Sequence, residues 1–209
     1  MDHLRQESTT ATRARRVLFV QGGGTGTHDE WDSHLVASLR AGLGAGHEVR
    51  YPRMPDEDDP SYARWSAAIT RELADLDEGA VVVGHSVGGA ILVQTLIERP
   101  PPRGLAAIVL VAAPFVGRDG WPGDGFELSG DVGDRLPRGV LVHVFHGARD
   151  ESVPPAHAGL YADAIPQAQV HLLPDRDHQL DGDLSEVAET IRRAAAGERT
   201  AAGERTAAG

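Results

Sequence analysis

The stretch Val81-Val82-Val83-Gly84-His85-Ser86-Val87-Gly88-Gly89-Ala90 decides the fold of this chain. Its three β-branched apolar residues predict a buried strand. The apolar spacing of residues 90–97 predicts a helix directly after it. The glycines between these two elements predict a sharp turn. The stretch is therefore a strand, a tight turn and a helix, with Ser86 at the apex of the turn.

The pattern G-x-S-x-G in this context is typical of a turn that presents a nucleophilic serine. Gly84 and Gly88 remove side chains that would clash in so tight a turn, and backbone strain at Ser86 directs its hydroxyl out of the sheet. The N-terminus of the following helix then lies close to any negative charge that develops on a bound carbonyl. The alternative interpretation is a glycine-rich turn with an incidental serine. The flanking strand and helix favour the nucleophile.

Composition narrows the class of protein. The chain has 209 residues, 41% of them hydrophobic, which suits one globular domain with a sizeable core. Its net charge of −11 argues against a nucleic-acid partner. The sequence has no cysteine, which excludes disulfides, thiolate catalysis and cysteine-ligated zinc. Residues 1–16 lack the apolar stretch of a signal peptide, and no segment approaches the ~18 apolar residues of a membrane span. We therefore expect a soluble, cytoplasmic protein.

Predicted strands alternate with predicted helices along the chain. The strands are expected at residues 16–21, 47–51, 81–83, 105–112, 140–145 and 169–173, and the main helices at 29–41, 62–76, 90–97, 154–165 and 184–196. This alternation predicts a mainly parallel sheet covered by helices on both faces, with ligands at the carboxyl ends of the strands. We expect one domain over residues 16–196, a flexible lead over 1–15 and a disordered repeat tail over 197–209.

Activation of a serine hydroxyl requires a base, and the base requires an orienting acid. His178 is the best candidate base, because it lies in a polar loop between the last strand and the last helix. Asp150 follows the strand predicted at 140–145 and is the best candidate acid. Glu151 is a near rival for that role and Asp177 a weaker one. A surface-loop histidine and a turn-capping aspartate are the corresponding structural interpretations.

Together these residues resemble the α/β-hydrolase family, in a small form without a cap domain. The resemblance covers roughly residues 16–195 and depends on the order of the elbow, the Asp150 turn and the His178 loop. It implies a Ser86–His178–Asp150 triad that hydrolyses esters, thioesters or related acyl compounds. It also implies an oxyanion hole, with the backbone amide of Val87 as one donor and that of Gly23 as the other.

Two positions depart from the usual family pattern. Many relatives begin the oxyanion loop with His-Gly, where this chain has Gln21-Gly22, so the support of that loop must differ. Many relatives also have glycine before the catalytic histidine, where this chain has Asp177. That extra carboxylate either increases the basicity of His178 or distorts the loop. Neither departure removes a member of the expected triad.

The sequence thus predicts a serine hydrolase of small or medium acyl esters that requires no metal and no organic cofactor. The acidic residues 56–59 lack an alternating ligand pattern and are expected to form a solvated loop. Only about 64 positions separate Ser86 from Asp150, so a large lid is not expected. Two alternatives stay open: a non-catalytic binding protein on the same scaffold, and an acyltransferase or perhydrolase with the same triad. The oligomeric state is not predicted.

Overall fold

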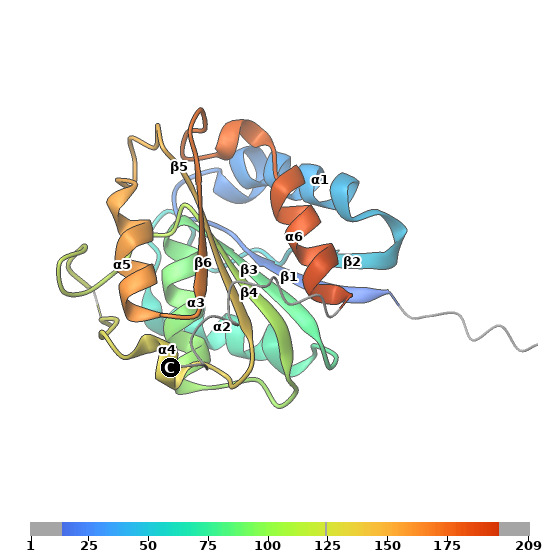
Figure 1. The fold of residues 1–209 in the computed structure, drawn as a ribbon, viewed down its shortest axis with the longest axis horizontal. Helices are drawn as coiled ribbons and strands as arrows, with labels where there is room; N and C mark the ends of the chain where they lie inside the picture. The colour runs from blue at the N-terminus through green and yellow to red at the C-terminus, as the bar shows by residue number, and fades with distance from the viewer. Residues whose placement is uncertain (1–13, 124, 197–209) are drawn as a thin grey trace, which may run out of the picture.

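The computed structural model describes residues 14–123 and 125–196 (Figure 1). The strands are β1 (Arg15–Val20), β2 (His47–Arg50), β3 (Ala80–His85), β4 (Leu105–Val111), β5 (Leu141–Gly147) and β6 (Ala168–Leu173). The α-helices are α1 (Asp32–Leu43), α2 (Tyr62–Ala74), α3 (Ser86–Glu98), α4 (Val132–Arg135), α5 (Ala156–Ala164) and α6 (Ser185–Ala195). Short helical turns η1 (Thr27–Trp31), η2 (Gly44–Gly46) and η3 (Leu180–Gly182) complete the described elements.

All six strands pair in parallel, in the order β2-β1-β3-β4-β5-β6. The central strands β1, β3 and β4 are apolar on both faces because helices cover both sides of the sheet. The predicted parallel α/β sheet is confirmed. The strand order reverses direction at β1, which places the loops after β1 and β3 side by side at the carboxyl edge.

Two hydrophobic layers sandwich the sheet. One face of the strands packs against α2, α3 and α5, with Trp65, Ile91 and Tyr161 fully buried in that layer. The opposite face packs against α1 and α6, with Leu35, Phe145 and Ile191 in its core. Figure 1 shows α1 and α6 together on one side and α2, α3 and α5 on the other. Side chains that alternate along each strand supply both layers.

The connection between β4 and β5 contains only the four-residue helix α4 among its described residues. This supports the prediction of a fold with a minimal cap or none. Strand β1 begins at Arg15, one residue before the predicted domain boundary, because Arg15 pairs with His47 of β2. The predictions for residues 1–13 and for the tail 197–209 lie outside the described residues. Among the described helices, none is both long and apolar enough to cross a membrane.

Candidate active site

Ser86 is the first residue of α3 and directly follows β3. Its φ of 51° is the left-handed conformation that non-glycine residues rarely adopt. A Cβ atom on Gly84 would lie 2.5 Å from Cα of Gly89, and one on Gly88 would lie 2.0 Å from the carbonyl oxygen of Gln21. The turn can therefore pack this tightly against α3 and the end of β1 only with glycine at both positions.

The structure brings Ser86, His178 and Asp150 together. Nε2 of His178 lies 3.1 Å from Oγ of Ser86, and Nδ1 of the same ring lies 2.8 Å from Oδ2 of Asp150. His178 comes from the loop after β6 and Asp150 from the loop after β5, so parallel strand ends deliver all three. The result is a continuous hydrogen-bonded chain from a carboxylate through an imidazole to a hydroxyl.

Neither Glu151 nor Asp177, the two alternative candidates for the orienting acid, is the carboxylate that contacts Nδ1 of His178. Glu151 is exposed. Oδ1 of Asp177 accepts hydrogen bonds from the backbone amides of Gln179 and Asp181, both at 2.9 Å. Asp177 thus organises the turn that follows His178, which explains how a carboxylate occupies the position where relatives have glycine.

Asp150 is held ionised by its surroundings. Its side chain is fully buried, and Oδ1 accepts hydrogen bonds from the amides of Ser152 at 2.9 Å and Val153 at 2.8 Å. Nε2 of His146 lies 3.2 Å from Oδ2. Burial opposes ionisation, but the hydrogen bonds from His146, His178 and the Val153 amide together lower the pKa of the carboxyl well below its usual range. A carboxylate of this kind keeps Nδ1 of His178 protonated and leaves Nε2 as the acceptor.

A pocket of about 320 Å³ opens above Ser86 and His178. Gly22, Gly23 and Gly24 form one wall, and the half-exposed indole of Trp31 forms part of the rim. The backbone at Gly23 runs beside Val87, since a Cβ on Gly23 would lie 3.0 Å from Cγ1 of that residue. The predicted oxyanion residues Gly23 and Val87 are therefore neighbours at the serine. A wider hollow of about 470 Å³ shares Ser152 and His178 and is lined by Arg149, Glu151, Asp177 and Asp181.

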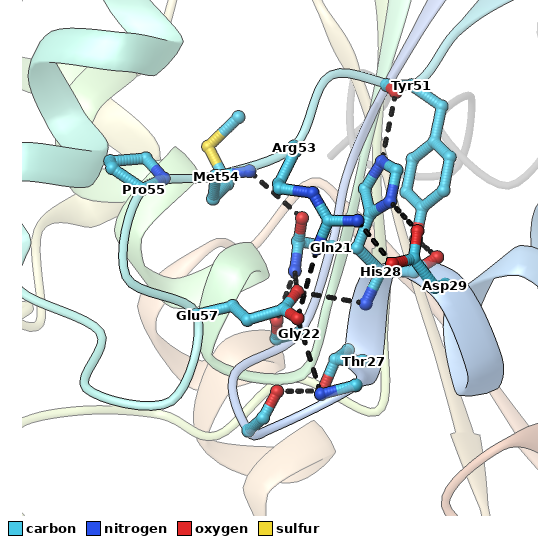
Figure 2. Close-up of polar contacts among 12 residues, drawn as sticks. Gln21, Gly22, Thr27, His28, Asp29, Tyr51, Arg53, Met54, Pro55 and Glu57 are labelled. Carbon is cyan, nitrogen blue, oxygen red and sulfur yellow. Dashed lines mark hydrogen bonds and ion pairs between the residues drawn. The ribbon is translucent and has the colours of Figure 1, made fainter.

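The glycine loop is braced by Glu57, as Figure 2 shows. Oε2 of Glu57 accepts hydrogen bonds from Nε2 of Gln21 at 2.7 Å and from the amide of His28 at 3.0 Å. Oε1 accepts from the Gly26 amide at 3.3 Å and pairs with Nη1 of Arg53 at 3.1 Å. One carboxylate thus ties both ends of the loop to the segment after β2.

Gln21 is fully buried and completes this brace, because its Oε1 accepts a hydrogen bond from the Met54 amide at 2.9 Å. This is how the chain supports its loop with glutamine in place of the usual histidine. The expectation that residues 56–59 form only a solvated loop is wrong for Glu57, whose side chain is 15% exposed. Among the described residues, no three His, Cys, Asp or Glu side chains are grouped as metal ligands.

Sequence reasoning missed four residues of this environment: Asp32, Glu57, His85 and His146. Asp32 and His85 form a buried pair next to the serine turn, with Nδ1 of His85 2.9 Å from Oδ1 of Asp32. His146 had the signal of a polar residue at the end of a buried strand, four positions before an aspartate. Glu57 gave no separate signal, because it lies in a run of four acidic residues whose other three members are exposed.

This fold and serine turn define an α/β hydrolase, and the comparisons with known proteins agree. The model of the alpha/beta hydrolase family matches residues 17–141, and the chain belongs to that family. No curated protein sequence matches the chain.

Solved structures with the same fold share little sequence with this chain. The ydeN gene product from B. subtilis is 18% identical, with a TM-score of 0.70 over 88% of this chain and 100% of that one. Est1E from Butyrivibrio proteoclasticus is 17% identical, with a TM-score of 0.65 over 90% of each chain. The esterase domain of a Rhodothermus marinus protein is 20% identical, with a TM-score of 0.62 over 91% of this chain and 89% of that one. At such identities the likeness concerns the fold alone.

Proposed function

We propose that this protein is a serine hydrolase that cleaves a carboxylic ester or related acyl bond through an acyl-enzyme on Ser86. The observation that carries the proposal is the hydrogen-bonded chain from Asp150 through His178 to Ser86, which ends at an open pocket. A buried ionised carboxylate, an oriented imidazole and a strained serine form the arrangement that makes a hydroxyl nucleophilic.

In the proposed reaction, Nε2 of His178 takes the proton of Ser86 as Oγ attacks the substrate carbonyl. The carbonyl becomes a tetrahedral oxyanion, and Asp150 stabilises the imidazolium that has formed without taking its proton. His178 then protonates the leaving group, which departs as an alcohol. A water molecule, deprotonated by the same imidazole, attacks the acyl-enzyme and releases the acid.

Two backbone amides are proposed to bind the oxyanion. The Val87 amide lies in the first turn of α3, where backbone donors have no partner within the helix. Gly23 supplies the other, since the Gly22 amide is already bound to Oδ2 of Asp32 at 2.7 Å. One such donor typically contributes about 2.7–4 kcal/mol to the transition state.

The proposed substrate is a small or medium acyl compound. The pocket of about 320 Å³ is at the low end of ligand sites, and the described part of the β4–β5 connection carries no helical cap that could enclose a long chain. The proposed reaction takes place in the cytoplasm and requires no metal, organic cofactor or nucleic acid.

A panel of short-chain esters and thioesters tests this proposal. We expect turnover by the wild type to fall with acyl length and to vanish in Ser86→Ala, with the melting temperature unchanged. Equal turnover by wild type and Ser86→Ala would refute it.

A further inference from the structure

A buried carboxylate–imidazole pair, Asp32 and His85, lies next to the serine turn and takes no part in the chemical steps proposed above. Asp32 is the first residue of α1, and His85 is the last residue of β3. Their side chains are 0% and 1% exposed. Nδ1 of His85 lies 2.9 Å from Oδ1 and 3.0 Å from Oδ2 of the carboxylate. Such groups are costly to bury, so their placement beside a reactive serine calls for a functional explanation.

Each member of the pair makes one further contact with the active site. Oδ2 of Asp32 accepts a hydrogen bond from the Gly22 amide at 2.7 Å, at the start of the glycine loop. Nε2 of His85 lies 3.2 Å from the main-chain carbonyl oxygen of His178. The pair therefore connects the two loops that flank Ser86, although these loops are far apart in the sequence.

The two ring nitrogens of His85 face an oxygen of the Asp32 side chain and a main-chain carbonyl oxygen. When Asp32 is ionised, as its hydrogen bond from the Gly22 amide favours, neither oxygen can donate a proton. A neutral imidazole has one donor and one acceptor nitrogen, so only the imidazolium satisfies both contacts. Burial opposes this charge, but Coulombic attraction to Asp32 and the hydrogen bond that the ring donates to its carboxylate raise the pKa of His85, with smaller contributions from the hydrogen bond to the His178 carbonyl and from the charge of Asp150. The ring of His178, 5.0 Å away between centroids, also faces it.

We propose that Asp32 and protonated His85 are positioning residues that fix the Gly22–Gly24 loop and the main chain of His178 relative to Ser86. This inference rests on the proposed function. Because the pair is neutral as a whole, it holds both loops without adding net charge beside the base. An error of about 1 Å in such alignment can cost about 100-fold in rate.

Two measurements test the proposal on the full chain. The first is ¹⁵N NMR of histidine-labelled protein at neutral pH, with the His85 signals assigned by their loss in His85→Gln. We expect both ring nitrogens of His85 to be protonated in the wild type and only one in Asp32→Asn. A singly protonated His85 in the wild type would overturn the proposal, and this result does not depend on how any Asp32 variant folds.

The second measurement is the steady-state kinetics of Asp32→Asn on a short-chain ester. The amide keeps the size of the side chain but loses the charge, so we expect kcat to fall about 10- to 100-fold while KM changes less than about twofold. Asp75→Asn is the matched control, since its carboxylate is 71% exposed on α2's C-terminal cap. A folded Asp32→Asn with the kcat of the wild type would contradict the proposal. Absence of all turnover in the wild type would refute the proposed function instead, and the NMR result would still decide the state of the pair.

Discussion

The exchange of Asp150 for asparagine removes one charge from the proposed triad, and the structure determines how the new amide must sit. Oδ1 of Asp150 accepts two backbone hydrogen bonds, from Ser152 at 2.9 Å and Val153 at 2.8 Å. The carbonyl oxygen of the asparagine must occupy that position, because an NH₂ group there would face two donors. The NH₂ group then faces Nδ1 of His178 across 2.8 Å.

This orientation reverses the tautomer of the imidazole. Nδ1 of His178 becomes an acceptor, the proton moves to Nε2, and Nε2 no longer accepts the proton of Ser86, 3.1 Å away. The same reversal in a Ser-His-Asp triad lowers kcat by roughly 10⁴-fold, which corresponds to about 5.5 kcal/mol. We expect a loss of that order in Asp150→Asn with the fold retained.

Ester turnover and the rate of fluorophosphonate labelling measure this loss, and circular dichroism monitors the fold. Glu151→Gln is the matched control, because it makes the same chemical change on an exposed neighbour. We expect its turnover to stay within about twofold of the wild type. The reasoning fails if a folded Asp150→Asn keeps a tenth of the activity, or if Glu151→Gln shows the larger loss.

Three further predictions concern the support of the site and the core. Glu57→Gln weakens the charged brace of the glycine loop, so ester kcat should fall about tenfold, whereas Asp59→Asn, 90% exposed, should match the wild type. Burial and the adjacent His171 lower the pKa of His143 from 6.5 to about 4. Between these two pH values His143 binds a proton in the unfolded chain but not in the folded one. The contribution of neutral His143 to the free energy of unfolding is therefore fully present above pH 6.5 and is lost as the pH falls towards 4. Chemical denaturation should show that His143→Gln removes up to about 3 kcal/mol of this pH dependence, and an unchanged dependence would contradict the assignment. Gly88→Ala would put a Cβ 2.0 Å from the carbonyl oxygen of Gln21, the residue after β1. We therefore expect about 1–3 kcal/mol of destabilisation and loss of fluorophosphonate labelling. A melting temperature and labelling rate like those of the wild type would refute this steric argument.

Local sequence patterns predicted the parallel sheet and the relative placement of the candidate site. The elbow motif indicated Ser86, and the position of a polar loop after a strand indicated Asp150 and His178. The structure brings these three residues together because the strands of a parallel sheet all end at one edge. Strand β5 extends to Gly147, two residues beyond the prediction, because Gly147 pairs with Leu173 of β6. That pairing is a tertiary contact and has no local signal.

The supporting residues could not be predicted in the same way. The partner of His85 is Asp32, which is 53 residues distant in the sequence. Glu57 binds Gln21 across 36 residues. A buried glutamine side chain requires hydrogen-bond partners, so Gln21 at the end of a predicted strand indicates that polar groups lie near it. The sequence does not indicate which residues supply those groups.

Covalent labelling of Ser86 tests the central claim most directly. Wild type and Ser86→Ala are treated side by side with a fluorophosphonate probe, and their intact masses are compared. The account predicts a single adduct on the wild type and none on the folded variant. A folded wild type without an adduct, or an adduct that persists in Ser86→Ala, would contradict it.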